Sequence, residues 1–253
     1  MQDVCKQIHW TSVRSHGSET ITKSIIANLH PMDSAIAQRI ARITQSVPPS
    51  VRSIAVSKTV SVERIREAYE AGIRDFGENR IQEATTKQDR LQDLSDVTWH
   101  FIGHLQSNKA KIALERFDWI HSVDRLKLAI ALDKLIEKGA PSPILCLQVK
   151  LRPDPNKSGW TVSELLADLP ALDRCEHLNI QGLMTISPLG LDEAETQAVF
   201  RETRQLAEQI RGLNLSRISM TQLSMGMSGD YPLAVTEGAT AVRLGRILFG
   251  ERE

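Results

Sequence analysis

The sequence predicts an α/β protein with a single (β/α)₈ TIM barrel, on three observations. From residue 32 onward, short apolar runs of strand type alternate with segments whose apolar residues recur every three or four positions. Eight strand candidates follow one another with short connections, which favours parallel pairing and closure over an open sheet. No Gly-x-Gly-x-x-Gly motif follows the first run, so the usual fingerprint of a dinucleotide-binding sheet is missing.

The elements follow in order along the chain. Strands are expected at residues 53–58, 75–77, 99–105, 119–123, 144–151, 180–186, 222–225 and 241–244. Helical spacing marks residues 62–71, 126–138, 162–169 and 193–213, after a first helix that carries Ile36, Ile40, Ile43 and Val47. Gly72 and Gly139 are expected to end two of these helices, and two prolines after Gly139 stop the second from continuing.

Length and composition predict one domain. The 253 residues, 41% of them hydrophobic, suffice for one large core, which we expect over residues 32–253. Residues 1–31 are expected to be a poorly ordered N-terminal extension, and Met32 is a candidate start because it precedes the first helical pattern. No run approaches the roughly 18 consecutive apolar residues of a membrane span, and the N-terminus lacks the apolar core of a secretory signal.

Charge and cysteine content argue against several classes of partner. Thirty-one basic residues balance 31 acidic ones, so no broad positive field would attract nucleic acid or an acidic membrane surface. The three cysteines are far apart and fit neither a disulfide framework nor a C-x-x-C metal site. We expect reduced thiols in a cytoplasmic protein, with Cys146 a small core residue.

Lys58, at the carboxyl end of the first expected strand, is the main candidate for chemistry. Parallel barrels build their active sites at the carboxyl ends of the strands. A desolvated lysine there can lose its proton and attack a carbonyl carbon to form a Schiff base. The ordinary alternative is a lysine that caps the strand and reaches solvent, because most lysines are surface residues.

Two glycine-rich segments favour a phosphate site. They are residues 223–231, which precede a helix expected near Pro232, and residues 243–250. Small residues let backbone amides approach an anion, although glycine and serine alone usually mean a turn. The loops after the last two strands of such barrels are a recurrent phosphate site. A ligand with both a phosphate and an aldehyde for Lys58 describes pyridoxal phosphate.

Arg243 would complete that site. It faces the same interior as Lys58 if Val242 and Leu244 face the helices. An arginine does not readily give up its proton, so beside the pyridine nitrogen it would leave that nitrogen unprotonated and weaken the ring as an electron sink.

Six motifs, in order along the chain, resemble those of the pyridoxal phosphate homeostasis protein family. They occupy residues 55–59, 76–79, 99–109, 182–185, 223–230 and 243–245. The match covers about residues 32–251. The family is similar in fold to the N-terminal barrel of alanine racemase, fold type III of pyridoxal phosphate proteins, and lacks the C-terminal β domain of that enzyme.

The resemblance implies a role for each matching residue. Lys58 would hold the cofactor as an aldimine, and Arg243 would face the pyridine nitrogen. Asn79 would lie near the ring or its hydroxyl, and Thr185 would contribute from the sixth strand. The phosphate would be held by Ser224, Gly226 and Gly245 and by the backbone amides of Met225 and Arg246.

The implied function is reversible binding of pyridoxal phosphate in intracellular vitamin B6 and amino-acid homeostasis, with apoenzymes as candidate recipients. Two alternatives stay open: a racemase or decarboxylase of the same fold, and a cofactor-free aldolase or phosphate-binding lyase that uses Lys58. Racemases of this type resemble a two-domain plan in which a second domain and a partner subunit supply a tyrosine base. Because this chain stops at Glu253, we expect a binding protein without catalytic residues, and a monomer.

Several other residues have ordinary interpretations. His100 and His104 are expected at the barrel mouth and not as metal ligands, since no acidic or cysteine residue stands at a ligand spacing. Asp230 is expected to cap the following helix, and Tyr231 to pack at the rim. Residues 152–160 are expected to form a solvated connection, with a lid or a partner surface as the alternative.

Overall fold

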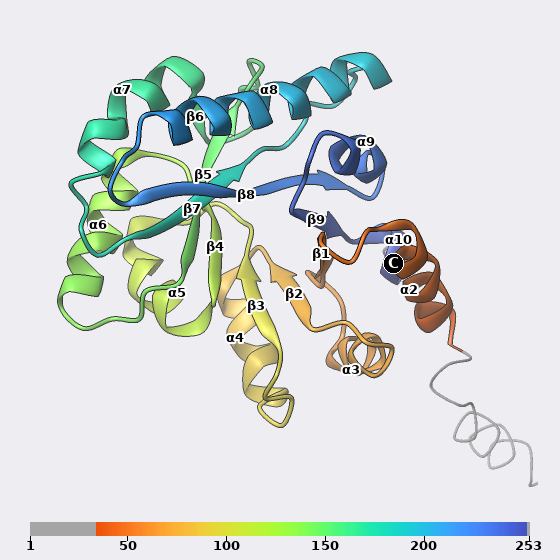
Figure 1. Ribbon diagram of the computed structural model, residues 1–253. Helices are drawn as coiled ribbons and strands as arrows, with labels where there is room; N and C mark the ends of the chain where they lie inside the picture. The colour runs from red at the N-terminus through yellow and green to blue at the C-terminus, as the bar shows by residue number, and fades with distance from the viewer. Residues whose placement is uncertain (1–33, 252–253) are drawn as a thin grey trace, which may run out of the picture.

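Eight parallel strands close into a barrel in the computed structural model, which describes residues 34–251 (Figure 1). Strand β4 pairs with β5 and strand β1 pairs with β9, which closes the ring. The predicted barrel is therefore confirmed. In ring order the strands are β1 (Arg52–Val56), β2 (Asp75–Glu78), β3 (Thr98–Phe101), β4 (Trp119–Val123), β5 (Ile144–Lys150), β7 (Asn179–Met184), β8 (Ile218–Met227) and β9 (Ala241–Leu244).

Helices surround the barrel because each presents one apolar stripe to the strands. The first described helix, α2, begins where the side chain of Ser34 accepts a hydrogen bond from the amide of Ala37, and it packs against α3 and α10. The helices are α2 (Ala35–Ser46), α3 (Val62–Glu70), α4 (Ile81–Arg90), α5 (Ala110–Arg116), α6 (Leu126–Glu137), α7 (Val162–Leu172), α8 (Glu193–Gly212), α9 (Tyr231–Thr236) and α10 (Arg246–Phe249), with the short 3₁₀ helix η2 (Ser107–Lys109).

The core has two parts. A large apolar cluster fills the space around the strands and includes Phe76, Phe101 and Phe200. A small second cluster of Trp119, Cys146 and Met184 is separate from it. Cys146 is fully buried, as expected, and burial raises the pKa of its thiol to about 12.

Of the strand ends that differ from prediction, two bear on the site. Strand β1 ends at Val56, so Lys58 lies in a turn and not in the strand. Strand β3 ends at Phe101, four residues early, because the chain at Gly103 passes directly over the backbone of Asn79. A Cβ atom at Gly103 would lie 2.1 Å from the Asn79 carbonyl oxygen. That close approach redirects the chain out of the sheet.

The connection at residues 152–160 is not wholly a solvated loop. It ends in a two-residue strand, β6 (Trp160–Thr161), which pairs with β5. The Trp160 ring is buried, and its Nε1 donates to Asp168 Oδ2 at 2.8 Å, which ties this end of the connection to α7. The prediction of a solvated connection was wrong at Trp160. A buried indole packs against other side chains and needs an acceptor for its N–H, and both contacts hold this end of the connection against the barrel.

The expectations for residues 1–31 and for Cys5 lie outside the described residues. Within residues 34–251, no helix has both the length and the apolarity to cross a bilayer.

Candidate functional site

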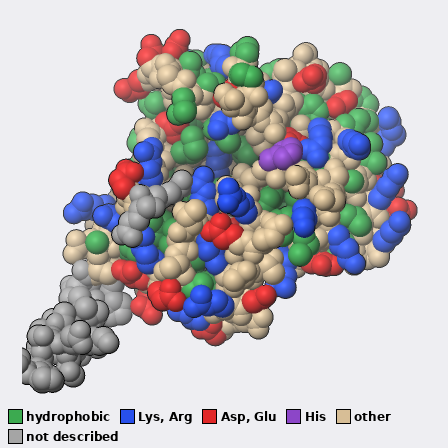
Figure 2. All heavy atoms as spheres, turned by 180° about the vertical axis from the view of Figure 1, so that it is seen from behind, with side chains coloured by type: hydrophobic (Ala, Val, Ile, Leu, Met, Phe, Trp, Pro, Cys, Tyr) green, Lys and Arg blue, Asp and Glu red, His purple; other side chains and the backbone are tan. Residues whose placement is uncertain are grey.

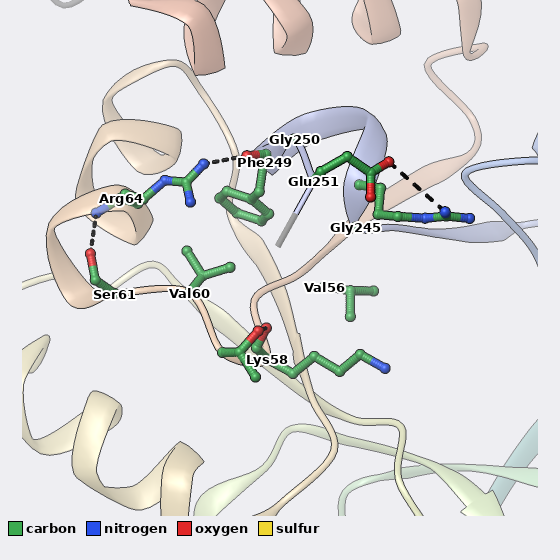
Figure 3. Close-up of a pocket in the computed structure, with 11 residues that line it drawn as sticks. Val56, Lys58, Val60, Ser61, Arg64, Gly245, Phe249, Gly250 and Glu251 are labelled. Atoms are coloured by element: carbon green, nitrogen blue, oxygen red, sulfur yellow. Dashed lines mark hydrogen bonds and ion pairs between the residues drawn. The ribbon is translucent and has the colours of Figure 1, made fainter. Parts of the chain in front are cut away.

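A cavity of about 470 Å³ opens at the carboxyl ends of β1 and β9, and Lys58 lines it (Figure 3). Its walls are the turn after β1, the start of α3, the turn after β9, and α10. Three basic side chains, Lys58, Arg64 and Arg246, line it against one carboxylate, Glu251. Figure 2 shows Lys and Arg side chains gathered around a hollow on the face seen from behind. A volume and charge balance of this kind suit a small anionic ligand.

The turn that carries Lys58 is held in an uncommon conformation. The Ser57 amide still donates to the Gly77 carbonyl at 3.0 Å, so β1 remains bound to β2 up to the residue before Lys58. Thr59 then adopts φ of 63°, which is rare for a β-branched residue. Its amide donates to Glu83 Oε1 at 2.5 Å. Contacts on both sides of Lys58 thus fix the backbone at that residue.

A buried ion cluster lies behind this turn. Lys87 Nζ donates to Glu78 Oε1 at 2.8 Å, to Glu83 Oε1 at 2.6 Å and to the Ser57 carbonyl at 2.7 Å. The Glu78 side chain is fully buried, and the hydroxyl of Ser57 donates to the same Oε1. Burial raises the pKa of Glu78, and the bonds from Lys87 and Ser57 offset only part of that effect. The cluster links the residue before Lys58 to β2 and α4.

Sequence reasoning missed this cluster. Glu78 belongs to the motif at residues 76–79, but nothing in that motif shows that its carboxylate is buried. Lys87 lies in the last turn of α4 among polar residues, where a lysine ordinarily faces solvent. The nine-residue separation of the pair gave no signal, because the contact depends on how α4 packs against the barrel.

Arg243 lies inside the barrel and is almost fully buried. Its Nη1 donates to the Ser224 carbonyl at 2.7 Å and to Ser224 Oγ at 2.8 Å, while Nη2 donates to the Thr185 carbonyl at 2.8 Å. Burial lowers the pKa of the guanidinium to about 10, so it stays protonated at neutral pH. Arg243 therefore acts only as a donor.

Two predicted ligands have side chains that are already engaged. Ser224 is buried, and its hydroxyl contacts His121 Nδ1 at 2.8 Å as well as Arg243. Thr185 is also buried, and its Oγ1 donates to the Val149 carbonyl at 2.9 Å. Both side chains hold the barrel interior together.

A second serine of the same motif lies next to the cavity. Ser228 Oγ accepts hydrogen bonds from the amide of Gly245 at 3.1 Å and from the amide of Ile247 at 3.4 Å. These amides therefore point at one shared acceptor position, which is what an anion requires. Sequence reasoning placed the phosphate on Ser224. The signal for Ser228 was its place in the turn after β8, where side chains leave the sheet.

The remaining predicted residues lie in three places. Gly245 and Arg246 line the cavity with Lys58. Asn79 lines a different pocket, next to His104 and Lys109. Met225 is buried in β8, and Gly226 has φ of 91° with Ala234 Cβ only 2.5 Å from where its own Cβ would be, so a side chain there is excluded.

His100 and His104 lie in different environments. His100 is fully buried in the barrel, bonded to His121 and Asp75, and so the prediction of a place at the mouth was wrong for it. His104 is half-exposed and contacts Asp124 Oδ2 at 2.8 Å and Ser158 Oγ at 3.0 Å. Within residues 34–251 no group of three or more His, Cys, Asp or Glu side chains could hold a metal ion.

Asp230 and Tyr231 also find other partners. Asp230 precedes α9, but its side chain makes no capping bond to that helix. Its Oδ1 accepts instead from the Met227 amide at 2.5 Å, which braces the turn after β8. The Tyr231 hydroxyl lies 3.1 Å from Ser46 Oγ on α2. The expected side-chain cap at Asp230 was therefore wrong.

A closed parallel barrel with a lysine after its first strand and a buried arginine on its last defines the class of the alanine racemase N-terminal domain, whose family model matches residues 33–253. Solved alanine racemases share this fold at low identity: that of Corynebacterium glutamicum is 19% identical with a TM-score of 0.66, over 86% of this chain and 61% of that one.

Nearer relatives identify the family within the class. A pyridoxal phosphate homeostasis protein of Synechocystis is 53% identical over 84% of this chain and 96% of its own length, and that of Escherichia coli is 36% identical over 90% and 95%. The solved structure of PipY from Synechococcus elongatus with PLP bound has a TM-score of 0.81 and 53% identity, over 85% of this chain and all of that one. The chain belongs to the pyridoxal phosphate homeostasis protein family.

Proposed function

We propose that this protein binds pyridoxal 5'-phosphate reversibly and takes part in intracellular vitamin B6 and amino-acid homeostasis. The observation that carries the proposal is that Lys58 lines the same cavity as the turn after β9, where two amides converge on one acceptor position. An amine and an anion site on one cavity match the two ends of this cofactor. Family membership and the PLP-bound PipY structure support the same assignment.

The residues present fit the group. When bound, pyridoxal phosphate supplies an aldehyde that condenses reversibly with a primary amine. Lys58 would provide that amine, from a turn that Ser57 and Thr59 fix on both sides. The amides of Gly245 and Ile247, with the Ser228 hydroxyl, would hold the phosphate.

Arg243 would face the pyridine nitrogen as a donor. Because it stays protonated at neutral pH, it favours a ring nitrogen that carries no proton of its own. Such a ring withdraws electrons weakly, so it gives little support to a carbanion. Ser224 would position Arg243 and not the phosphate, since its hydroxyl already contacts that guanidinium. Asn79, Thr185, Gly226 and the Met225 and Arg246 amides remain proposed contributors through their loops and backbone.

The same geometry favours binding over turnover. The acid and base candidates on the turn after β8 are committed to structure, Asp230 to the Met227 amide and Tyr231 to Ser46. We infer that the protein is a carrier that passes its cofactor to apoenzymes, acts as a monomer in the cytoplasm, and has no racemase or decarboxylase activity of its own. Size-exclusion chromatography with light scattering tests the monomer.

The test uses purified protein and two lysine variants. Wild-type protein incubated with pyridoxal phosphate should show the visible absorption of a cofactor bound through an amine, and Lys58→Ala should lose it. Lys111→Ala is the matched control, because Lys111 has a largely exposed side chain on α5. Colour that persists unchanged in Lys58→Ala would refute the role of Lys58.

A second experiment separates carriage from catalysis. Loaded protein is incubated with individual L-amino acids, and the products are analysed for D-amino acids and amines. In parallel it is mixed with an apoenzyme whose activity reports the arrival of cofactor. Transfer without turnover supports the carrier; robust turnover would establish an enzyme instead. A protein that never colours but cleaves a phosphorylated aldol would support the lyase alternative.

A further inference from the structure

A chain of polar side chains crosses the barrel interior, and its lower half starts at the amino-terminal ends of the strands. There Arg52 Nη1 lies 2.5 Å from Asp75 Oδ1. The same carboxylate oxygen lies 2.9 Å from His100 Nε2, and His100 Nδ1 lies 3.0 Å from His121 Nε2. Both imidazole rings are fully buried, whereas the Arg52 side chain is 40% exposed. The chain thus begins at solvent and enters the core.

The upper half ends at Arg243, two residues before Gly245, which lines the cavity. His121 Nδ1 lies 2.8 Å from Ser224 Oγ, and Arg243 Nη1 donates to that oxygen at 2.8 Å. Members of the chain come from β1, β2, β3, β4, β8 and β9, so six of the eight barrel strands contribute one residue each. No step of the proposed binding mechanism uses the two histidines.

The direction of every hydrogen bond follows from the two ends. A carboxylate only accepts, so His100 must donate from Nε2 to Asp75. Burial lowers the pKa of His100 and lowers that of His121 well below its ordinary value, so both rings are neutral and each carries one N–H. His100 Nδ1 must then accept, which obliges His121 to donate from Nε2. His121 Nδ1 is therefore an acceptor, and the Ser224 hydroxyl donates to it while accepting from Arg243.

Packing holds the rings in these positions. The His121 ring stacks on Trp119, with centroids 5.5 Å apart and an interplanar angle of 22°, and the His100 ring lies 5.5 Å from the same indole. The guanidinium carbon of Arg52 also lies over the Trp119 ring, 5.4 Å from its centroid. Moving either imidazole ring out of its position would therefore lose its contact with Trp119 as well as a hydrogen bond.

We propose that His100 and His121 are positioning residues, neutral with the proton on Nε2, which transmit the orientation set by Asp75 through Ser224 to Arg243. The carboxylate of Asp75, at the amino-terminal ends of the strands, thereby fixes the orientation of the Arg243 guanidinium on β9. The final step, from Arg243 to the pyridine nitrogen, rests on the proposed function. The steps from Asp75 to Arg243 do not.

The first test measures the hydrogen-bonded chain of side chains in protein without cofactor. Protein labelled with ¹⁵N in histidine and arginine is studied by NMR at neutral pH, and His100→Gln and His121→Gln spectra assign the two rings among the seven histidines. Each ring should show a protonated Nε2 and an unprotonated Nδ1. Asp75→Leu, which removes the terminal acceptor, should alter both ring patterns and shift the side-chain resonance of Arg243. A cationic ring, a proton on Nδ1 in the wild type, or an unmoved Arg243 resonance would overturn the proposal.

Ser122→Ala is the matched control. Ser122 follows His121 on β4 and is fully buried, but its hydroxyl has no hydrogen-bond partner among the described residues. Its removal should leave the two rings and Arg243 unchanged. Far-UV circular dichroism and thermal unfolding establish that each variant is folded. If Asp75→Leu does not fold, the comparison of His121→Phe, which breaks the chain, with His121→Gln, which keeps one donor and one acceptor, decides the same question through the Arg243 resonance.

The second test reads the cofactor. His121→Phe should shift the visible band of bound pyridoxal phosphate and release it roughly tenfold faster, a factor that corresponds to about 1.4 kcal/mol and lies within the range for an unsatisfied buried polar group. His121→Gln should restore part of both. If the wild type binds no pyridoxal phosphate, the proposed function fails. The NMR spectra of the two histidine rings and of Arg243 still test whether the hydrogen-bonded chain from Asp75 to Arg243 exists. If His121→Phe binds and releases cofactor as the wild type does, the link from chain to site is refuted.

Discussion

Replacing Lys87 with methionine would test the buried ion cluster behind the Lys58 turn. The substitution keeps most of the side-chain length but removes the cation that contacts Glu78, Glu83 and the Ser57 carbonyl. The Lys87 and Glu78 side chains are 8% and 0% exposed, so water cannot replace the lost partner without opening the structure. Breaking such a buried pair from one side typically costs about 3–5 kcal/mol.

Protonation of Glu78 limits that cost. Taking up a proton at pH 7 costs about 1.4 kcal/mol for each pH unit above the carboxyl pKa. With the ordinary value of 4.5 the cost would be at most about 3.4 kcal/mol, and burial lowers it because it already raises the pKa of Glu78. We therefore expect Lys87→Met to lower the free energy of unfolding by about 3 kcal/mol at pH 7. For a chain of this size the melting temperature would fall by roughly 6–12 °C.

The penalty should depend on pH with a definite sign. The pKa of Glu78 is raised in the folded protein, and loss of Lys87 raises it further, so the folded state holds the proton more tightly than the unfolded state does. The stabilisation that Glu78 contributes by holding this proton is fully present below the pKa of its carboxyl in the unfolded state. It is lost as the pH rises through the pKa of Glu78 in the folded state. The penalty should shrink to about 1 kcal/mol near pH 5 and grow toward pH 8.

Urea unfolding at four pH values between 5 and 8 measures this penalty. Lys111→Met is the control, because Lys111 is largely exposed, its nearest carboxylate oxygen on Glu115 is 3.9 Å away, and such pairs contribute about 0–1 kcal/mol. Glu78→Gln combined with Lys87→Met should be more stable than Lys87→Met alone at pH 8. A penalty below about 1 kcal/mol at pH 7, or one that does not change with pH, would refute the reasoning. Cofactor retention should fall with stability, because Lys87 also holds the backbone next to Lys58.

Two further predictions concern the loops and the core. Gly103→Ala should lower the free energy of unfolding by about 1–3 kcal/mol and weaken cofactor binding, because a Cβ there would overlap the Asn79 carbonyl. Gly212→Ala, at the end of α8 with no atom within 4 Å of the added Cβ, should be neutral or stabilising in the same denaturant titration. Cys146 should resist iodoacetamide at pH 8 in native protein and react in urea, as mass spectrometry of the peptide would show, since its thiol has a pKa of about 12; alkylation of the native protein would contradict that burial.

The barrel and Lys58 were predictable because their signals are local. Strand and helix periodicities repeat over a few residues, and the position of Lys58 after an apolar run needs only the boundary of one strand. The boundary itself was two residues too late, since the conformation of the turn at Thr59 depends on Glu83 in another element. Lys58 nevertheless lines the cavity, because the turn keeps it at the carboxyl end of β1.

The places of His100 and His104 required knowledge of where β3 ends. Side chains alternate along a strand, so two histidines four residues apart share a face only while the strand continues. Strand β3 ends at Phe101, because Gly103 brings the chain against Asn79. His100 therefore stays in the barrel while His104 emerges. The close approach is made between segments more than 20 residues apart, and no local pattern reports it.

The choice between Ser224 and Ser228 as the phosphate ligand also depends on where a strand ends, which no local pattern in the sequence reports. Both serines lie in one five-residue stretch, and composition alone favours neither as the phosphate ligand. Strand β8 extends to Met227, so Ser224 is still a strand residue, buried against Arg243, while Ser228 begins the turn and meets the amides after β9. A phosphate assigned to Ser224 would break its contact with Arg243. The serine in the turn can donate its hydroxyl hydrogen to an anion, or give way to it, without disturbing the barrel. The anion site therefore lies in the loop, and the side chain that supports Arg243 lies in the strand.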